Sequence, residues 1–134
     1  MNARAFIDTN ILIYALARGD SRWETARKIV RDGGVISVQV LNEFVSVSRR
    51  KLRLSWLDIA AEIEVIGLSM TDIVPLTIDI HDAARSVAER HKIAFYDALL
   101  VAAAIKAKCK TLYTEDLHDG AVIEGVAIRN PFIV

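Results

Sequence analysis

Two hydrophobic patterns alternate along this chain. Short apolar runs, typical of buried strands, occur at 4–7, 35–37, 73–76, 111–113 and 126–128. Longer segments carry apolar residues three and four positions apart, as amphipathic helices do, at about 11–17, 21–32, 39–50, 55–67, 79–91 and 96–107. Alternating strands and helices predict an α/β domain with a mostly parallel central sheet of four to five strands, flanked by helices.

Local signals refine three of these elements. The segment Ser21-Arg22-Trp23-Glu24 has the form of a capping box, which predicts a helix start at Ser21, and Gly33-Gly34 gives that helix its stop signal. Pro75 cannot donate a ladder hydrogen bond, so we expect the strand at 73–76 to lie at a sheet edge or to end there. The helix at 96–107 is apolar nearly all round, which predicts a central position in the domain.

The length of 134 residues, with no linker, repeat or low-complexity tract, predicts a single domain over residues 1–134. Hydrophobic residues make up 53% of the chain, which indicates a large core or an apolar surface reserved for a partner. The longest apolar stretch, 98–105, is far below the ~20 residues of a membrane span. The single cysteine, Cys109, allows no intrachain disulfide, and we interpret it as a buried thiol in a reducing cytoplasm.

The charges balance, because 17 basic and 17 acidic residues leave a formal net charge of zero. This balance argues against non-specific coating of nucleic acid by a basic surface. A nucleic-acid enzyme is not excluded, since metal ions in an acidic pocket can supply the charge that meets phosphate. Basic residues do cluster locally, at 49–53 and at 85–92. Each cluster is either a solvated helix end or a rim that contacts a nucleic-acid backbone.

Four acidic residues stand in four separate stretches, each beside an apolar segment that can position it. Asp8 and Asp116 follow predicted strands, Glu43 lies one turn beyond the strand at 35–37, and Asp97 lies in the first turn of a helix. Ligands of open α/β sheets bind beyond the carboxyl ends of the strands. If the fold brings these ends together, the crowded carboxylates need a cation to ionise together. We therefore infer that a hard divalent metal, Mg²⁺ or Mn²⁺, binds at this site.

Each acid also has an ordinary structural explanation. Asp8 could cap the helix that follows it, and Asp97 could favour the positive end of its helix. Asp116 could be a turn residue, and Glu43 a solvated helix position. For any one of these residues taken alone, the structural role is favoured. The joint pattern favours a shared site.

Polar neighbours accompany two of the strand ends. Asn10 follows Asp8 by two residues, and Thr114 precedes Asp116 by two. Hydroxyl and amide side chains of this kind orient metal-binding carboxylates by hydrogen bonds. A shared cation would explain all of these placements together.

Other catalytic chemistries lack their motifs in this sequence. There is no Gly-rich phosphate loop and no G-x-S-x-G elbow. His81, His91 and His118 lack zinc-like spacing, and Cys109 has no nearby histidine to activate it. These absences leave the acidic quartet as the candidate for chemistry.

Four segments in order resemble the PIN-domain ribonucleases, and especially the VapC-type toxins of bacterial and archaeal toxin–antitoxin pairs. They are FIDTNILIY at 6–14, NE at 42–43, FYDAL at 95–99 and LYTEDL at 112–117. The resemblance covers essentially the whole chain, including the closing segment at 125–132. None of the four acidic positions of the family is missing. Glu115 and Asp119 are additional acids to which the sequence assigns no role.

The resemblance implies a PIN-like three-layer α/β/α sandwich and a metal-dependent endoribonuclease that hydrolyses RNA phosphodiester bonds. By similarity, Asp8 and Asp97 would be the principal Mg²⁺ ligands, and Asp116 would complete the site or hold a second ion. Glu43 would bind metal directly or through water. Asn10 and Thr114 would orient the ligands and the substrate. The family further implies a homodimer and a small antitoxin partner that blocks the site.

Three alternatives remain open beside the toxin ribonuclease. The chain could be a housekeeping RNA-processing nuclease, or a non-catalytic interaction module that retains the fold. A phospho-acceptor signalling domain also gathers acids at strand ends, but it would want an adjacent acid pair after the first strand. Ile7-Asp8-Thr9 lacks that pair, so this alternative ranks last.

Overall fold

The computed structural model describes residues 4–133; residues 1–3 and 134 lie outside the described part. Its strands are β1 (Ala5–Ile7), β2 (Val35–Ser37), β3 (Asp72–Val74), β4 (Thr111–Tyr113), β5 (Val122–Ile123) and β6 (Val126–Arg129). Its helices are α1 (Thr9–Tyr14), α2 (Trp23–Asp32), α3 (Val38–Arg50), α4 (Trp56–Ser69), α5 (Ile78–His91) and α6 (Phe95–Lys106). Every strand and helix expected from the sequence is present, with ends that differ by a few residues.

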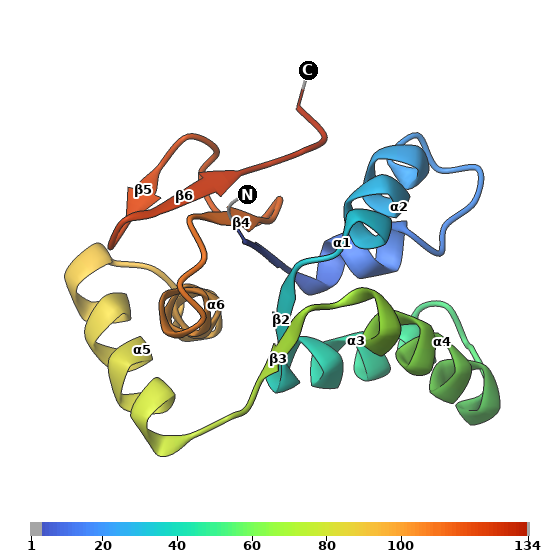
Figure 1. Ribbon diagram of the computed structural model, residues 1–134, viewed down its shortest axis with the longest axis horizontal. Coiled ribbons are helices and arrows are strands. Elements are labelled where there is room, and N and C mark those ends of the chain that lie inside the picture. The colour runs from blue at the N-terminus through green and yellow to red at the C-terminus, as the bar shows by residue number, and fades with distance from the viewer. Residues whose placement is uncertain (1–3, 134) are drawn as a thin grey trace.

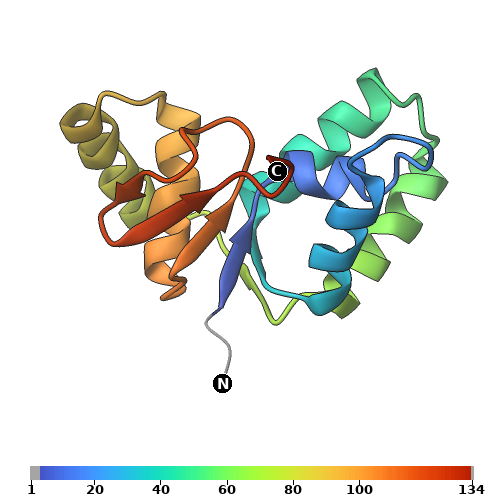
Figure 2. The ribbon, with the colours of Figure 1, turned by 90° about the horizontal axis from the view of Figure 1, so that it is seen from above.

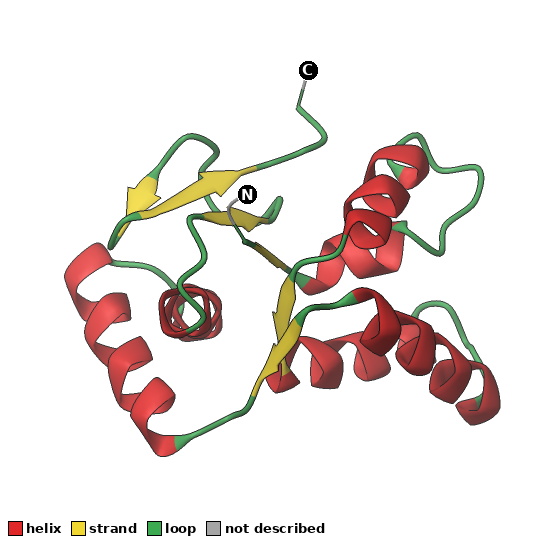
Figure 3. Cartoon of the chain, viewed as in Figure 1, coloured by secondary structure: helices red, strands yellow, loops and turns green. Residues whose placement is uncertain are grey.

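A six-stranded sheet forms the middle layer of the molecule, in the order β3-β2-β1-β4-β6-β5. Neighbouring strands are parallel, except that β5 runs antiparallel to β6. Helices α5 and α6 lie on one side of the sheet and α1 to α4 on the other (Figures 1 and 3). The predicted fold class, a three-layer α/β/α arrangement with a mostly parallel sheet, is confirmed.

The predicted number of four to five strands was too low by one strand, β5. This strand has only two residues, too few to produce an alternating pattern. It pairs with β6 through a tight turn at Glu124 and Gly125, whose φ angles are 50° and 82°. Two successive positive φ angles are the geometry of a two-residue hairpin turn.

The capping box predicted at Ser21 is wrong. Helix α2 begins at Trp23, and Arg22 occupies the capping position without a side-chain capping bond. Instead, the carboxylate of Asp20 accepts hydrogen bonds from the backbone and the guanidinium of Arg22. A charged acceptor forms stronger hydrogen bonds than a serine hydroxyl, which explains why Asp20 organises this turn.

Two other sequence predictions hold. β3 is an edge strand, and Pro75 directly follows its last residue. The helix predicted at the centre, α6, is buried at every position from 98 to 104. It packs against α5 and the sheet, and Figure 1 views it end-on between them.

The parallel strands direct their carboxyl ends to one edge of the sheet. β1 and β4 lie side by side and point the same way (Figure 2). Because Ile7 pairs with Tyr113 in register, the residues that follow them, Asp8 and Thr114, become neighbours. α3 starts directly after β2, which carries Glu43 to the same edge.

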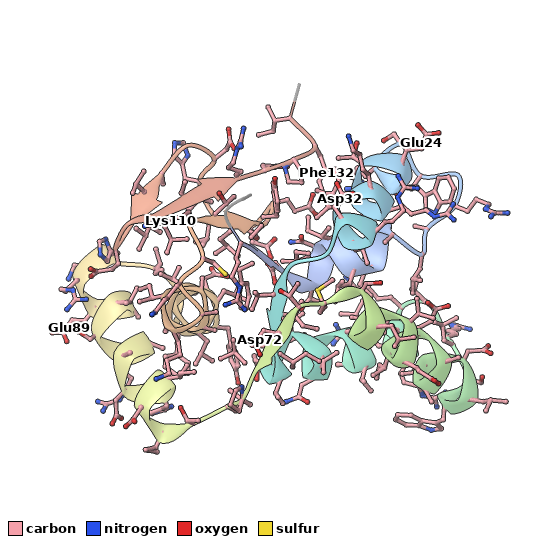
Figure 4. The ribbon with its side chains drawn as sticks, viewed as in Figure 1. Glu24, Asp32, Asp72, Glu89, Lys110 and Phe132 are labelled. Atoms are coloured by element: carbon pink, nitrogen blue, oxygen red, sulfur yellow. The ribbon has the colours of Figure 1, made fainter. Side chains whose placement is uncertain are left out.

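Three further properties concern the surface and the core. None of the described helices is long and apolar enough to cross a membrane. Cys109 is buried, as expected. Charged side chains such as Glu24 and Glu89 project from the outer helices (Figure 4).

Candidate active site

Asp8 lies at the centre of the candidate site and is almost fully enclosed, with 2% of its surface exposed. It caps α1, and one carboxylate oxygen accepts a hydrogen bond from the backbone N–H of Thr9 at 2.6 Å. The other oxygen accepts the hydroxyl hydrogen of Thr114 at 2.7 Å. The structural role suggested by the sequence, helix capping, is therefore real, and it occurs within the acidic cluster.

Burial raises the pKa of Asp8 from 3.8 to about 7, against the opposing effect of the hydrogen bonds from Thr114 and Thr9. The charges of Asp116 and Glu43 make smaller contributions to the same rise in pKa. No ion pair found among residues 4–133 involves Asp8. A buried carboxylate surrounded by other carboxylates lacks a positive partner.

Asn10 joins Asp8 to Asp116. Its amide nitrogen donates to Asp8 Oδ2 at 3.4 Å and to Asp116 Oδ2 at 3.3 Å. Thr114 supports the same pair, since its hydroxyl donates to Asp8 and accepts from the backbone N–H of Asp116 at 3.1 Å. The amide oxygen of Asn10 is buried and has no hydrogen-bond partner in the described structure. An unpaired buried oxygen of this kind calls for a cation or a water.

Glu43 is held by two side-chain donors. The hydroxyl of Thr9 donates to Glu43 Oε2 at 3.1 Å, and Gln39 Nε2 donates to Oε1 at 3.1 Å. Gln39 was not recognised from the sequence, although its position four residues before Glu43 on one helix is the spacing that allows this contact. The two bonds orient the carboxylate from opposite oxygens.

Asp97 stands apart from the other three acids. It lies in the first turn of α6, and its pKa is raised by burial and by the charges of Asp116 and Glu43. These charges place it within electrostatic reach of the cluster, but it does not line the cleft that the others share. Across residues 4–133, no three acidic, histidine or cysteine side chains are close enough to hold an ion as they stand.

The cleft beside these residues has a volume of about 370 Å³. Its polar lining comprises Asp8, Thr9, Asn10, Tyr14, Glu43, Lys51, Glu115 and Asp116. Lys51 enters it from the end of α3 and belongs to one of the basic clusters seen in the sequence.

The two unassigned acids have structural partners. Glu115 accepts a hydrogen bond from the Tyr14 hydroxyl and lies 3.7 Å from a guanidinium nitrogen of Arg22. Tyr14 in turn packs edge-on against Phe132, which brings the C-terminal segment over α1 (Figure 4). The other acid, Asp119, accepts the backbone N–H of Asn130 at 2.7 Å.

The donor chemistry of the site fits a hard divalent ion. The groups are carboxylates and an unpaired amide oxygen, and Mg²⁺ and Mn²⁺ prefer oxygen ligands. Asp8 and Asp116, already joined by Asn10, are the residues best placed to bind first. Glu43 lines the same cleft, whereas Asp97 does not.

A comparison with protein-family models decides the family. The model described as PIN domain matches residues 5–118. The chain belongs to the PIN domain family. No match was found among curated protein sequences.

Several solved structures share the fold of this PIN domain. VapC20 of Mycobacterium tuberculosis, described as a sarcin-ricin loop cleaving toxin, is 23% identical with a TM-score of 0.68, covering 84% of this chain and 89% of that one. A toxin–antitoxin complex from Klebsiella pneumoniae is 24% identical with a TM-score of 0.69, covering 97% and 99%. DNA-bound VapBC from Salmonella typhimurium is 16% identical with a TM-score of 0.68, again covering 97% and 99%. These TM-scores show a shared fold.

Proposed function

We propose that this PIN domain is a Mg²⁺-dependent endoribonuclease and the toxin of a toxin–antitoxin pair. The observation that carries the proposal is the buried Asp8, which has other carboxylates around it and is in no ion pair of the described chain. Such a centre is electrostatically incomplete without a cation. The PIN family membership and the fold shared with toxin–antitoxin proteins support the same conclusion.

The reaction is hydrolysis of an RNA phosphodiester bond. A bound Mg²⁺ would supply Lewis-acid chemistry here, namely a lower pKa for a water and positive charge for the phosphoryl and leaving oxygens. Asp8 and Asp116 would hold the ion at the carboxyl edge of the sheet, while Asn10 and Thr114, which are hydrogen-bonded to both residues, orient them. Thr9 and Gln39 hold Glu43 toward the cleft. Asp97 adds negative charge from the start of α6.

RNA with single-stranded loops is the proposed substrate, because an in-line attack requires an accessible backbone. The open cleft beside the acids suits such a strand. Mn²⁺ should substitute for Mg²⁺, since both are bound by oxygen ligands.

The first prediction tests the role of Asp8. The substitution Asp8→Asn keeps the side-chain shape and removes the charge, and we expect cleavage of loop-containing RNA in Mg²⁺ to fall by at least about 100-fold. Thr114→Val, which removes a group that orients Asp8, should reduce cleavage by about 10- to 100-fold. Glu89→Gln is the control, because it also removes one negative charge but from an exposed site on α5.

Equal activity of the Asp8→Asn and Glu89→Gln proteins would contradict the role of Asp8. Purified wild-type protein without metal-dependent cleavage of any RNA would instead favour a non-catalytic interaction module. A gene that stands alone, without a short neighbouring gene for a DNA-binding antitoxin, would favour a housekeeping RNA-processing nuclease.

A small antitoxin and a second copy of the chain are the proposed protein partners. Helix α4 supports this proposal because it exposes large apolar side chains, namely Trp56, Leu57, Val65 and Leu68. Adjacent exposed apolar residues of this kind mark interaction surfaces. Light scattering of the purified chain and co-purification with the neighbouring gene product separate the two partners.

A further inference from the structure

One face of α3 lines the acidic cleft and carries a lysine, Lys51, at its far end. Glu43, Val47 and Lys51 follow one another at intervals of four residues, so they share a helix face, and all three line the cleft. At 1.5 Å per residue, Lys51 lies about 12 Å along the helix axis from Glu43. The cleft therefore has carboxylates at one end and an ammonium group at the other.

Lys51 lies within a cluster of cations that the fold leaves without carboxylate partners. Arg49, Arg50, Lys51 and Arg53 occur within five residues, and none of them takes part in an ion pair among residues 4–133. Arg49 is engaged elsewhere, since it donates to the Leu54 carbonyl and lies over the Trp56 ring. Arg50, Lys51 and Arg53 are exposed and remain available to an anion.

We propose that Lys51 is a positioning residue that contacts a phosphate of the RNA strand outside the metal centre, with Arg50 and Arg53 extending the path. This inference rests on the proposed ribonuclease function and adds the direction in which the strand leaves the site. Carboxylates repel a polyanion except where a metal ion neutralises them. A strand in the cleft therefore needs a cation beyond the reach of that ion, and Lys51 supplies one on the cleft wall.

The chemistry of Lys51 favours RNA over a protein partner. Lysine ammonium groups are strongly hydrated and are depleted from the cores of protein interfaces. Phosphate contacts, in contrast, are made by flexible cations at the surface. Four of the exposed large apolar side chains, Trp56, Leu57, Val65 and Leu68, lie on α4 and suit a protein partner.

The test is RNA binding as a function of salt, in the Asp8→Asn background so that the strand is not cleaved. A fluorescent single-stranded RNA is titrated with Asp8→Asn alone and with added Lys51→Ala, Lys51→Arg or Lys110→Ala. Lys110 is the matched control because it precedes β4, at the opposite end of the strand from Asp116 (Figure 4).

Loss of one phosphate contact should weaken binding and make the slope of log K against log salt less negative by about 0.7. We expect this change for Lys51→Ala. Lys51→Arg should restore the original binding and slope, and Lys110→Ala should leave both unchanged. In cleavage assays with the native Asp8, Lys51→Ala should raise KM more than it lowers kcat.

An unchanged slope for Lys51→Ala, in a protein whose wild type cleaves RNA, would overturn the inference and leave the proposed function standing. A change in unfolding free energy without a change in slope would assign Lys51 to stabilising the end of α3 and would also overturn it. An altered oligomeric state with unchanged RNA binding would overturn it in favour of a contact between copies. Wild-type protein that neither cleaves nor binds RNA would refute both proposals. RNA binding that depends on Lys51, in a protein that does not cleave RNA, would refute only the proposed ribonuclease activity.

Discussion

At the scale of single residues, Asp8 makes the stability of the metal-free protein depend on pH. Its pKa is about 7 in the folded chain and near 3.8 in the unfolded chain, so the folded state holds the proton more tightly. Between these two values the folded state binds more protons, and stability falls as pH rises. The shift in the Asp8 pKa between the unfolded and folded chains corresponds to roughly 4 kcal/mol of stability. This contribution is present at low pH and is lost above pH 7. The raised pKa of Asp97 acts in the same direction.

The second prediction follows from this sign. Without divalent metal, the free energy of unfolding should decrease from pH 4 to pH 7 and then level off, after subtraction of the trend common to other groups. Asp8→Asn should flatten most of that decrease, because an amide does not titrate. Urea unfolding of the wild-type and Asp8→Asn proteins at pH 5 and pH 8 measures this difference in unfolding free energy. The same pH dependence in both proteins would contradict the assignment to Asp8.

At the scale of elements, close backbone approach at Gly34 sets the seat of β2 beside β1. A Cβ atom at Gly34 would lie 2.6 Å from the carbonyl oxygen of Ala5, a contact that neither strand can relieve by a side-chain rotation. Gly67 offers a contrast, because it lies in α4 with nothing within 4 Å of such an atom.

The third prediction compares these two glycines. Gly34→Ala should destabilise the protein by about 2 kcal/mol or more, because overpacking forces the backbone to shift. Gly67→Ala should stabilise it by about 0.5–1 kcal/mol, since alanine has the higher helix propensity at an open helical position. Chemical denaturation of the two variants measures both effects. A stabilising Gly34→Ala would show that the strands are not held as described.

Elements also show why some predictions from the sequence failed. The helices and the longer strands were found because their apolar periodicity extends over several residues. β5 was missed because it has two residues, and the start of α2 was misplaced because the Asp20–Arg22 contact competes with the Ser21 capping signal. Local patterns cannot weigh two competing side chains against each other.

At the scale of the whole molecule, a bound cation should stabilise the fold. An ion that binds only the folded state adds RT ln(1 + [L]/Kd), about 2.7 kcal/mol at one hundred times Kd. Because Asp8 is ionised mostly above pH 7, the proton competes with the metal at lower pH.

The fourth prediction is that Mg²⁺ raises Tm, and more so at pH 8 than at pH 5. At one hundred times Kd the rise at pH 8 should be about 10 °C for a domain of this size. Differential scanning calorimetry measures it, with NaCl at equal ionic strength as the control. Asp8→Asn should lose most of the effect. A rise that is equal in that variant would place the bound ion elsewhere.

The sequence by itself determined the elements, their alternation and the identity of the acids, because these depend on side-chain chemistry and on contacts within a few residues. Tertiary structure decided which groups meet. Strand register put Asp8 beside Thr114, helix placement brought Glu43 within reach of Thr9, and the position of α6 kept Asp97 off the cleft. Burial of Asp8, and hence its raised pKa, arises only when separate segments exclude water from one carboxylate.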